Sequence, residues 1–385
     1  MCIFIGFSCI ISLVMDSNTQ PTLTVRMPQI GDRIAGRYEL QEIIGEGGMG
    51  QVFRAVQHPV GRNVALKVLL GEFVEDNVKQ ARFLREAQIL ANLKSAHTVS
   101  LIDFGVLDDG VVFIAMEYLE GGTLRDLIDR GSLPVRTAYI VAQQILKSIA
   151  EAHGQGIIHR DLKPGNVLID HIDGEKIVVR VADFGIAKWQ SPETSLESTQ
   201  TPELGLMPTA SVKAELVQTA PGMRLGTPEY IPPEQAFAKP IDHTVDLYAF
   251  GVIFYEMLVG RKPFSAENAQ GMYLAHLYEA PKPVLSVVPH LEISQKVDDL
   301  IMSLMQKLPE NRPQSAKSVL KLLNRVVHEA PLNEQTFTEM PALNPHFESA
   351  ELDEDEVVTP RSSVNLILLV VGSVLAGLGL GALLF

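Results

Sequence analysis

The segment GEGGMGQV, residues 45–52, places four glycines within eight positions, between two stretches rich in β-branched and aromatic residues. Glycine packs nothing inside a strand and costs conformational entropy there, so the cluster indicates that something bulky approaches the main chain. A phosphate group is one such object, and a glycine-rich hairpin turn is the other interpretation. A dinucleotide-binding fingerprint would start a helix at Gly50, whereas the following QVFRAVQ is typical of a strand. A glycine-rich loop between two strands is the arrangement of a lid over a nucleotide.

The hydrophobic pattern changes along the chain. Residues 38–116 read as short strands interrupted by one helix at 79–94, whose apolar stripe recurs at helical spacing: Phe83, Ala87 and Leu90. From about residue 123 the pattern becomes helical, as in RTAYIVAQQILKSIAEAHGQG and VDLYAFGVIFYEMLVG. We therefore predict a small β-rich lobe followed by a larger helical lobe, an α+β fold.

Charge and cysteine content limit the classes of function. The formal net charge is −14, and residues 331–360 hold eight acidic residues and no Lys or Arg. This balance argues against a nucleic-acid partner. Both cysteines, Cys2 and Cys9, lie in the first ten residues, so neither a disulfide framework nor a structural zinc site supports the fold. The folded part is therefore suited to a reducing cytosol.

Two apolar segments lie at the ends of the sequence. The first fifteen residues are too short to span a bilayer, which takes roughly 20 residues, and they lack the basic residue that opens a secretory signal. We interpret them as a misassigned start before Met15, with a signal peptide as the alternative. Residues 364–385 carry no charge and predict a transmembrane helix. Gly377 and Gly381 could let two such helices pack into a homodimer, although glycine is common in membrane helices.

Three further motifs carry chemistry. VALK, residues 64–67, ends an apolar run in Lys67, which needs a partner; Glu86 on the predicted helix is the candidate, and a plain surface ion pair is the alternative. HRDLKPGN, residues 159–166, and DFG, residues 183–185, supply carboxylates, an amide and a lysine. Magnesium prefers oxygen ligands, taking one or two carboxylates together with phosphates. The order and spacing of the motifs together indicate a magnesium–nucleotide site.

With G-x-G-x-x-G-x-V, V-A-x-K, H-R-D-L-K-P-x-N and D-F-G in this order, the sequence resembles the eukaryotic-like bacterial serine/threonine protein kinases over about residues 38–327. The resemblance implies a bilobal protein kinase fold, with an N-lobe at 38–118, a C-lobe at 119–327 and a long activation segment at 183–234. Residues 1–37 would then be an N-terminal segment, 328–363 an acidic linker and 364–385 the membrane helix.

The resemblance also implies roles for single residues. The glycine loop would cover the ATP triphosphate with its amide groups: Gly45, Glu46, Gly47, Gly48 and Gly50. Lys67, oriented by Glu86, would hold the α and β phosphates, and Lys163 would steady the γ-phosphate. Asp161 would accept the proton of the substrate hydroxyl. The ligands of Mg²⁺, with Mn²⁺ as the alternative ion, would be Asn166 and Asp183.

The adenine would lie between Val52, Ala65 and Leu168, against the hinge from Glu117 to Leu119, with Met116 behind it. Without the resemblance, these are ordinary core and turn residues. HRDLKP and GTPEY, residues 226–230, resemble serine/threonine rather than tyrosine kinases. Further expected roles are a bond from Thr227 to the catalytic Asp and Lys, a buried pair of Glu234 with Arg312, and support of the catalytic loop by Asp246.

Residues 190–223 within the activation segment are rich in Ser, Thr, Pro and Glu and read as a mobile insertion. Arg160, beside the catalytic Asp161, suggests regulation by a phosphate on this segment. Thr219 is the preferred acceptor, with Thr209 and Ser211 as the alternatives.

The sequence therefore predicts an ATP-dependent kinase of Ser and Thr residues in proteins, without a nucleic-acid partner, with its catalytic part in the cytoplasm and a single membrane helix. The protein would be tail-anchored, or the chain truncated. A pseudokinase that acts as a scaffold is one alternative, and a small-molecule kinase of related architecture is another. The GTPEYIPPE segment argues against the second, because it forms a protein-docking ledge in the family.

Overall fold

The computed structural model describes residues 28–47, 50–69, 77–107, 110–172, 176–184, 228–236 and 240–329. Several predictions lie outside these residues: the N-terminal segment to residue 27, Gly48, Thr227, the proposed phosphorylation sites, most of the acidic linker and the segment 364–385. Among the helices that the structure does describe, none has both the length and the apolar character needed to cross a bilayer.

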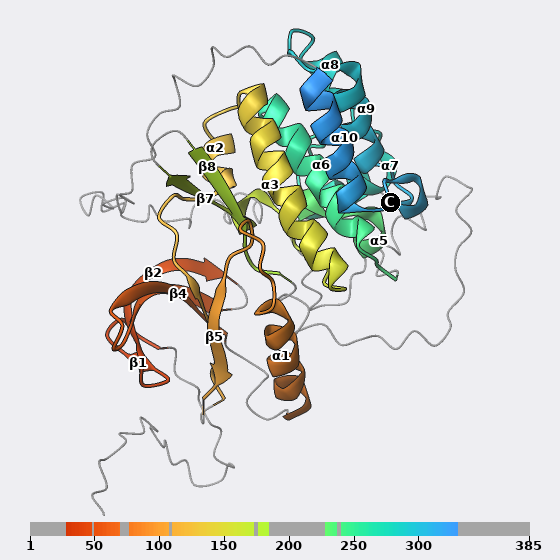
Figure 1. Ribbon diagram of the computed structural model, residues 1–385. Helices are drawn as coiled ribbons and strands as arrows, with labels where there is room; N and C mark the ends of the chain where they lie inside the picture. The colour runs from red at the N-terminus through yellow and green to blue at the C-terminus, as the bar shows by residue number, and fades with distance from the viewer. Residues whose placement is uncertain are drawn as a thin grey trace, which may run out of the picture. The chain divides into compact units, whose positions relative to one another are not determined.

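The N-terminal lobe is a curled antiparallel sheet (Figure 1). Its six strands lie in the order β1-β2-β3-β4-β6-β5. Helix α1 (Asn77–Leu90) contacts β5. The strands are β1 (Arg33–Ile34), β2 (Tyr38–Gly47), β3 (Gly50–Gln57), β4 (Arg62–Leu69), β5 (Leu101–Val106) and β6 (Val112–Glu117).

Alternation along β4 sorts its side chains onto two faces, because successive residues of a strand point to opposite sides. Val64, Leu66 and Val68 are fully buried in the core of this lobe, together with aromatic residues of β2 and β3. Ala65 and Lys67 lie on the opposite face and are only half-buried. The alternation therefore directs Lys67 away from the core of this lobe.

The C-terminal lobe is helical, with one small two-stranded sheet, β7 and β8. Its elements are α2 (Leu124–Ile128), α3 (Val135–Gly154), η1 (Pro164–Asn166), β7 (Val167–Ile172), β8 (Lys176–Val181), η3 (Pro228–Tyr230), α5 (Pro233–Ala236), α6 (Thr244–Val259), α7 (Ala269–Tyr278), α8 (Val284–Val287), α9 (Gln295–Leu304), η4 (Pro309–Asn311) and α10 (Ala316–Glu329).

Helix α6 is the centre of this lobe. Its sequence is mostly apolar, apart from residues such as Asp246 and Glu256, and every residue from Thr244 to Leu258 is buried, as expected for a helix surrounded by others. It ends at Gly260, whose φ of 76° is the left-handed conformation that favours glycine at a helix end. Helix α3 is amphipathic; it packs against α6, β8 and α10. The loop of residues 155–163, which the resemblance identifies as the catalytic loop, follows directly from this packed helix.

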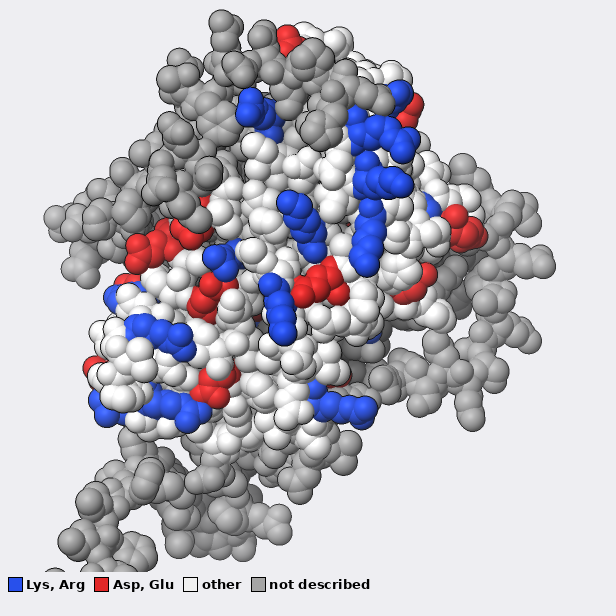
Figure 2. Space-filling model, in the orientation of Figure 1, with Lys and Arg blue, Asp and Glu red and all other residues white. Residues whose placement is uncertain are grey.

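Exposed basic residues follow α10 at four-residue spacing, one turn apart: Lys317, Lys321 and Arg325. Figure 2 shows a line of basic side chains over this helix. Charge is therefore unevenly distributed over a chain whose net charge is −14.

The N-lobe helix differs from its predicted range of 79–94. It ends at Leu90, because Asn92 and Leu93 bond to carbonyls three residues back and tighten the last turn. Beyond it, the backbone N–H groups of Lys94 and Ser95 donate to the Glu151 carboxylate at 2.8 and 2.7 Å. A tertiary contact with α3 therefore replaces the last turn that periodicity predicted.

Candidate active site

Asp246, in the first turn of α6, holds the start of the catalytic loop. Its carboxylate accepts the backbone N–H groups of His159 and Arg160, both at 2.8 Å, and His153 Nε2 at 2.8 Å. Burial by itself would raise the pKa of Asp246, but the His153 hydrogen bond and the neighbouring histidines outweigh it and lower the pKa. The carboxylate therefore stays ionised as an acceptor, and the predicted support of the loop by Asp246 is present.

Arg160 has a φ of 67°, which is unusual for a residue with a side chain. Two contacts hold it there: its N–H donates to Asp246, and its carbonyl accepts Gln235 Nε2 at 3.0 Å. Such a conformation persists only where surrounding contacts fix it. Asp161, the next residue, is half-buried, with 22% of its side chain exposed.

Asp161 is the centre of a polar cluster. Lys163 Nζ donates to its Oδ2 at 2.8 Å. Asn166 Nδ2 donates to the Asp161 carbonyl at 2.7 Å and to Oδ2 at 3.2 Å. Because the Asn166 amide nitrogen is used in this way, its amide oxygen is left for another ligand. The structure therefore brings together three of the residues that the sequence selected.

Asp183 lies next to this cluster. The N–H of Ala182 donates to the Asn166 carbonyl at 2.8 Å, and the carbonyl of Ala182 accepts His159 Nε2 at 2.8 Å. The Phe184 ring packs on His159, with centroids 4.6 Å apart. These contacts fix the residues on both sides of Asp183, whose φ is 60°. An amide oxygen and a carboxylate on adjacent backbone segments form a donor set that suits magnesium.

Lys67 reaches the same place from the other lobe. Its Nζ lies 2.9 Å from Asp183 Oδ2, although 116 positions separate the two residues in the sequence. The predicted ion pair with Glu86 is absent among the described side chains, where Glu86 lies half-buried on α1. That Glu86 orients Lys67 stays a prediction.

The residues expected around an adenine lie on strands of both lobes. Val52 on β3 is paired with Lys67 on β4. Ala65 on β4 is paired with Met116 near the end of β6, so these residues lie on neighbouring strands of the sheet. Leu168 lies on β7, is half-buried, and bridges to Thr123 at the start of α2. That these residues enclose an adenine stays a prediction.

The hinge carries a contact that the sequence did not indicate. The Glu117 carboxylate accepts the Ser100 N–H at 2.6 Å and Arg180 Nη1 at 3.2 Å. Arg180 lies on β8, three residues before Asp183. The side chain of Glu117 is therefore engaged within the protein, and Leu119 follows it in a segment without regular structure.

The glycine loop has a second reason for its composition. A Cβ on Gly50 would lie 2.0 Å from the Val68 carbonyl oxygen, and its φ of 141° also excludes most side chains. At Gly45, by contrast, a Cβ would meet only the Val52 side chain, at 3.6 Å. Close packing of β3 on β4 therefore requires Gly50, whatever binds above the loop.

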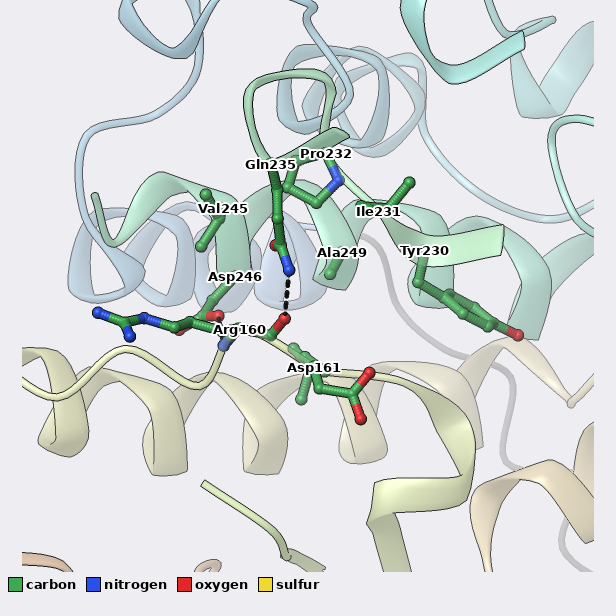
Figure 3. A pocket seen from close by; sticks show the side chains of 10 residues that line it. Arg160, Asp161, Tyr230, Ile231, Pro232, Gln235, Val245, Asp246 and Ala249 are labelled. Atoms are coloured by element: carbon green, nitrogen blue, oxygen red, sulfur yellow. Dashed lines mark hydrogen bonds between the residues drawn. The ribbon is translucent and has the colours of Figure 1, made fainter. Parts of the chain in front are cut away.

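A hollow opens beside Asp161 (Figure 3). Its walls come from the catalytic loop, from the start of α6 and from the segment that runs from η3 into α5. Figure 3 shows Gln235 bonded to the Arg160 carbonyl across it. The residues that sequence reasoning missed here are Tyr230, Ile231, Pro232 and Gln235. The sequence signal that could have found them is the GTPEYIPPEQ segment, in which roles are predicted for Thr227 and Glu234 alone.

Glu234, which precedes Gln235 on α5, pairs with Arg312. Two parallel hydrogen bonds, of 2.6 and 2.7 Å, join the guanidinium to the carboxylate, and both side chains are buried. Arg312 also donates to the carbonyls of Gln306, Lys307 and Thr244. The pair that the sequence predicted is therefore formed, with its remaining donors satisfied.

A β-rich lobe and a helical lobe, with a contact between Lys67 and Asp183 beside the cluster of Asp161 and Asn166, define the architecture of a protein kinase domain. The chain belongs to this family: residues 38–323 match the protein kinase domain. The predicted fold class is thereby confirmed.

Known proteins agree with this assignment. The serine/threonine-protein kinase pkn3 of Myxococcus xanthus is 39% identical over 291 residues, which are 75% of this chain and 50% of that protein. PrkC of Bacillus subtilis is 36% identical over 310 residues, 80% of this chain and 43% of that one. The chain thus spans about half the length of the curated relatives that it matches.

Solved structures show the same fold. The kinase domain of Mycobacterium tuberculosis PknI, crystallised as a point mutant, aligns with a TM-score of 0.56 at 23% identity, covering 78% of this chain and all of that one. Rad53 residues 1–466, solved in complex with AMP-PNP, aligns with a TM-score of 0.56 at 25% identity over 74% of this chain and 64% of that one.

Proposed function

We propose that this chain transfers the γ-phosphate of ATP to Ser and Thr hydroxyls of proteins. The observation that carries the proposal is the contact of Lys67 with Asp183 beside the cluster of Asp161, Lys163 and Asn166. Family membership and the named kinases among the relatives support it.

The residues divide the work by chemistry. Asp161 offers a carboxylate oxygen that can accept the proton of an incoming hydroxyl, and Lys163 holds that carboxylate in place. Lys67 supplies a cation for phosphate oxygens, and Asn166 and Asp183 would hold a divalent cation. Such a cation, when bound, neutralises charge on the phosphates. Because phosphoryl transfer passes through a loose transition state, positioning and charge stabilisation suffice, with no covalent nucleophile.

The proposal is tested with purified protein, labelled ATP and Mg²⁺, using a general protein acceptor. We expect Asp161→Asn and Lys67→Met to lose nearly all transfer, because one removes the proton acceptor and the other the phosphate contact. Glu39→Gln, a change at a partly exposed position on β2, is the matched control and should retain activity. Phosphate transfer that survives both active-site changes would favour the pseudokinase alternative.

A second measurement determines whether proteins or metabolites accept the phosphate. Acid-stable phosphate on Ser or Thr of proteins, identified by mass spectrometry, supports the proposal. Phosphate found on metabolites and never on protein would favour the small-molecule kinase alternative. Comparing Mg²⁺ with Mn²⁺ in the same assay determines which ion the protein uses.

Membrane attachment is a further part of the proposal. It is supported by the 22 uncharged residues 364–385, which follow Arg361 and the acidic linker. The kinase domain would face the cytoplasm, because ATP is found there. Deletion of residues 364–385 should move the protein from the membrane to the soluble fraction, and unchanged membrane association would contradict this. A homodimer through Gly377 and Gly381 would be lost in a double leucine variant that stays in the membrane.

Regulation by phosphorylation is proposed from the sequence alone. Thr219 in the activation segment is the preferred acceptor, and Arg160 is the cation that a phosphate would contact. Mass-spectrometric mapping of active protein should find Thr219 modified. An unmodified Thr219 in active protein would remove it from consideration and leave Thr209 or Ser211.

A further inference from the structure

Helix α10, the last element that the structure describes, has two different faces. The buried face belongs to the core of the C-terminal lobe, where the helix packs on α3 and α9. Its buried residues are Val319, Leu323 and Val326. The opposite face is exposed and carries the line of basic side chains in Figure 2. These three residues lie one turn apart and are called the α10 basic stripe: Lys317, Lys321 and Arg325.

The charges of the α10 basic stripe are not neutralised by acids of the helix. The sequence of α10, AKSVLKLLNRVVHE, has one acidic residue, at its last position. Within the described part of the chain, none of the three basic side chains forms an ion pair. By contrast, the exposed Arg33 on the N-terminal lobe is paired with Glu39 at 3.0 Å. Like charges at four-residue spacing destabilise a helix, so an anionic partner outside α10 would remove this repulsion.

The shape of the stripe indicates the kind of partner. Its first and last residues lie about 12 Å apart along the helix axis, at 1.5 Å per residue. A single phosphate group is bound by cations that converge on it, whereas a row of cations on a convex helix meets a flat anionic surface all at once. Leu322, 41% exposed, lies three residues before Arg325 and therefore beside it on the helix surface. An apolar side chain next to basic ones is typical of helices that lie in a membrane interface.

We propose that the α10 basic stripe binds the anionic head groups of a membrane. Each Lys or Arg close to an anionic membrane strengthens binding about fivefold, so three together strengthen it on the order of a hundredfold. A membrane is favoured over an acidic protein because the chain continues from α10 towards the uncharged residues 364–385. This choice rests on the proposed membrane attachment, to which the stripe adds a second contact on the kinase domain itself.

The test is lysine footprinting of the full chain on vesicles of phosphatidylcholine alone and of phosphatidylcholine with phosphatidylglycerol. After treatment with an uncharged acetylating reagent, mass spectrometry gives the rates of modification of Lys317 and Lys321. Lys282, which is exposed and lies outside α10, is the internal reference. We expect anionic lipid to slow the relative rate at least about fivefold, which corresponds to about 1 kcal/mol. High salt should restore the rate, because it screens the charges.

Arg325→Glu reverses one charge of the stripe and leaves both reporter lysines in place, so it should lose most of the protection. Arg62→Glu, at an exposed position on β4, makes the same change in net charge and should keep the wild-type protection. Equal relative rates on the two kinds of vesicle for the wild-type chain overturn the proposal, and this comparison needs no variant to fold. Protection already present on neutral vesicles also overturns it, because an acidic part of the protein would then cover the stripe.

Failure of the membrane attachment proposed for residues 364–385 would look different. The full chain would then stay in solution with neutral vesicles, whereas the stripe would still bring it to anionic ones. A chain that stays in solution with both kinds of vesicle overturns both proposals.

Discussion

At the scale of single residues, buried ionisable groups that lie outside the catalytic cluster shape the C-terminal lobe. His276 on α7 is such a group: its Nε2 lies 3.0 Å from the Glu229 carbonyl and its Nδ1 lies 2.9 Å from the Tyr248 hydroxyl. Because a carbonyl can only accept, Nε2 carries the proton, and Nδ1 accepts from the tyrosine. Neutral His276 therefore satisfies both partners and anchors the segment that contains Tyr230.

Burial, with a smaller contribution from Lys307, lowers the pKa of His276 from 6.5 to about 4. Between pH 6.5 and 4 the unfolded chain protonates His276, whereas the folded chain keeps it neutral. The free energy of unfolding therefore has its full value above pH 6.5 and falls as the pH drops towards 4. We expect His276 to account for a loss on the order of 3 kcal/mol over this range. Urea titrations at several pH values measure it.

In a His276→Gln variant the pH dependence between 6.5 and 4 should become shallower, whatever the stability at neutral pH. His290→Gln, at an exposed position, is the matched control and should keep the wild-type slope. Equal slopes for His276→Gln and wild type would contradict the assignment of this dependence to His276.

The buried pair of Glu234 and Arg312 gives a second prediction at this scale. Glu234→Ala should lower the free energy of unfolding by about 3–5 kcal/mol, because it leaves a buried guanidinium without its carboxylate. Glu39→Ala removes the partner of the exposed Arg33 and should lower the free energy of unfolding far less. Chemical denaturation compares the two. Similar costs for both changes would show that burial of the pair does not control its contribution.

At the scale of elements, backbone contact between segments fixes the site as firmly as side chains do. Gly121, just after the hinge, approaches β7 so closely that a Cβ would lie 1.7 Å from the Ile169 carbonyl oxygen. The adjacent Gly122 carbonyl accepts the Ile169 N–H at 2.9 Å. The hinge and the strand that follows the catalytic loop are therefore held against each other through main-chain atoms.

Gly121→Ala should destabilise the protein by about 1–3 kcal/mol, because one of the two backbones must move to admit the methyl group. Gly154→Ala, at the end of α3, is the matched control: nothing lies within 4 Å of its Cβ, and alanine favours a helix. Thermal unfolding of the two variants is the measurement. A Gly121→Ala protein as stable as wild type would mean that this approach is not required.

At the scale of the whole molecule, the site exists only where the two lobes meet. Lys67 comes from β4 in one lobe, and Asp183 follows β8 in the other. A nucleotide bound with its cation would contact both, so binding is linked to the stability of the folded domain.

We expect ATP at 100 times its Kd to add about 2.7 kcal/mol to the free energy of unfolding. With Mg²⁺ present the gain at fixed ATP should be larger, since Asn166 and Asp183 would hold the cation. Asp183→Asn should lose this magnesium-dependent part, whereas Asp299→Asn, on α9 and exposed, should keep it. A magnesium-dependent gain that survives in Asp183→Asn would exclude Asp183 as a ligand.

The sequence by itself determined the features that arise from local chemistry: the strand pattern around Gly50, the helical second half and the order of motifs that carry Asp161, Asn166 and Asp183. Only the tertiary structure decided that Lys67 contacts Asp183, and that Arg125 pairs with Glu256 across 131 positions of sequence. The physical reason is that periodicity records which face of an element is apolar, whereas partner choice depends on how distant elements pack against each other.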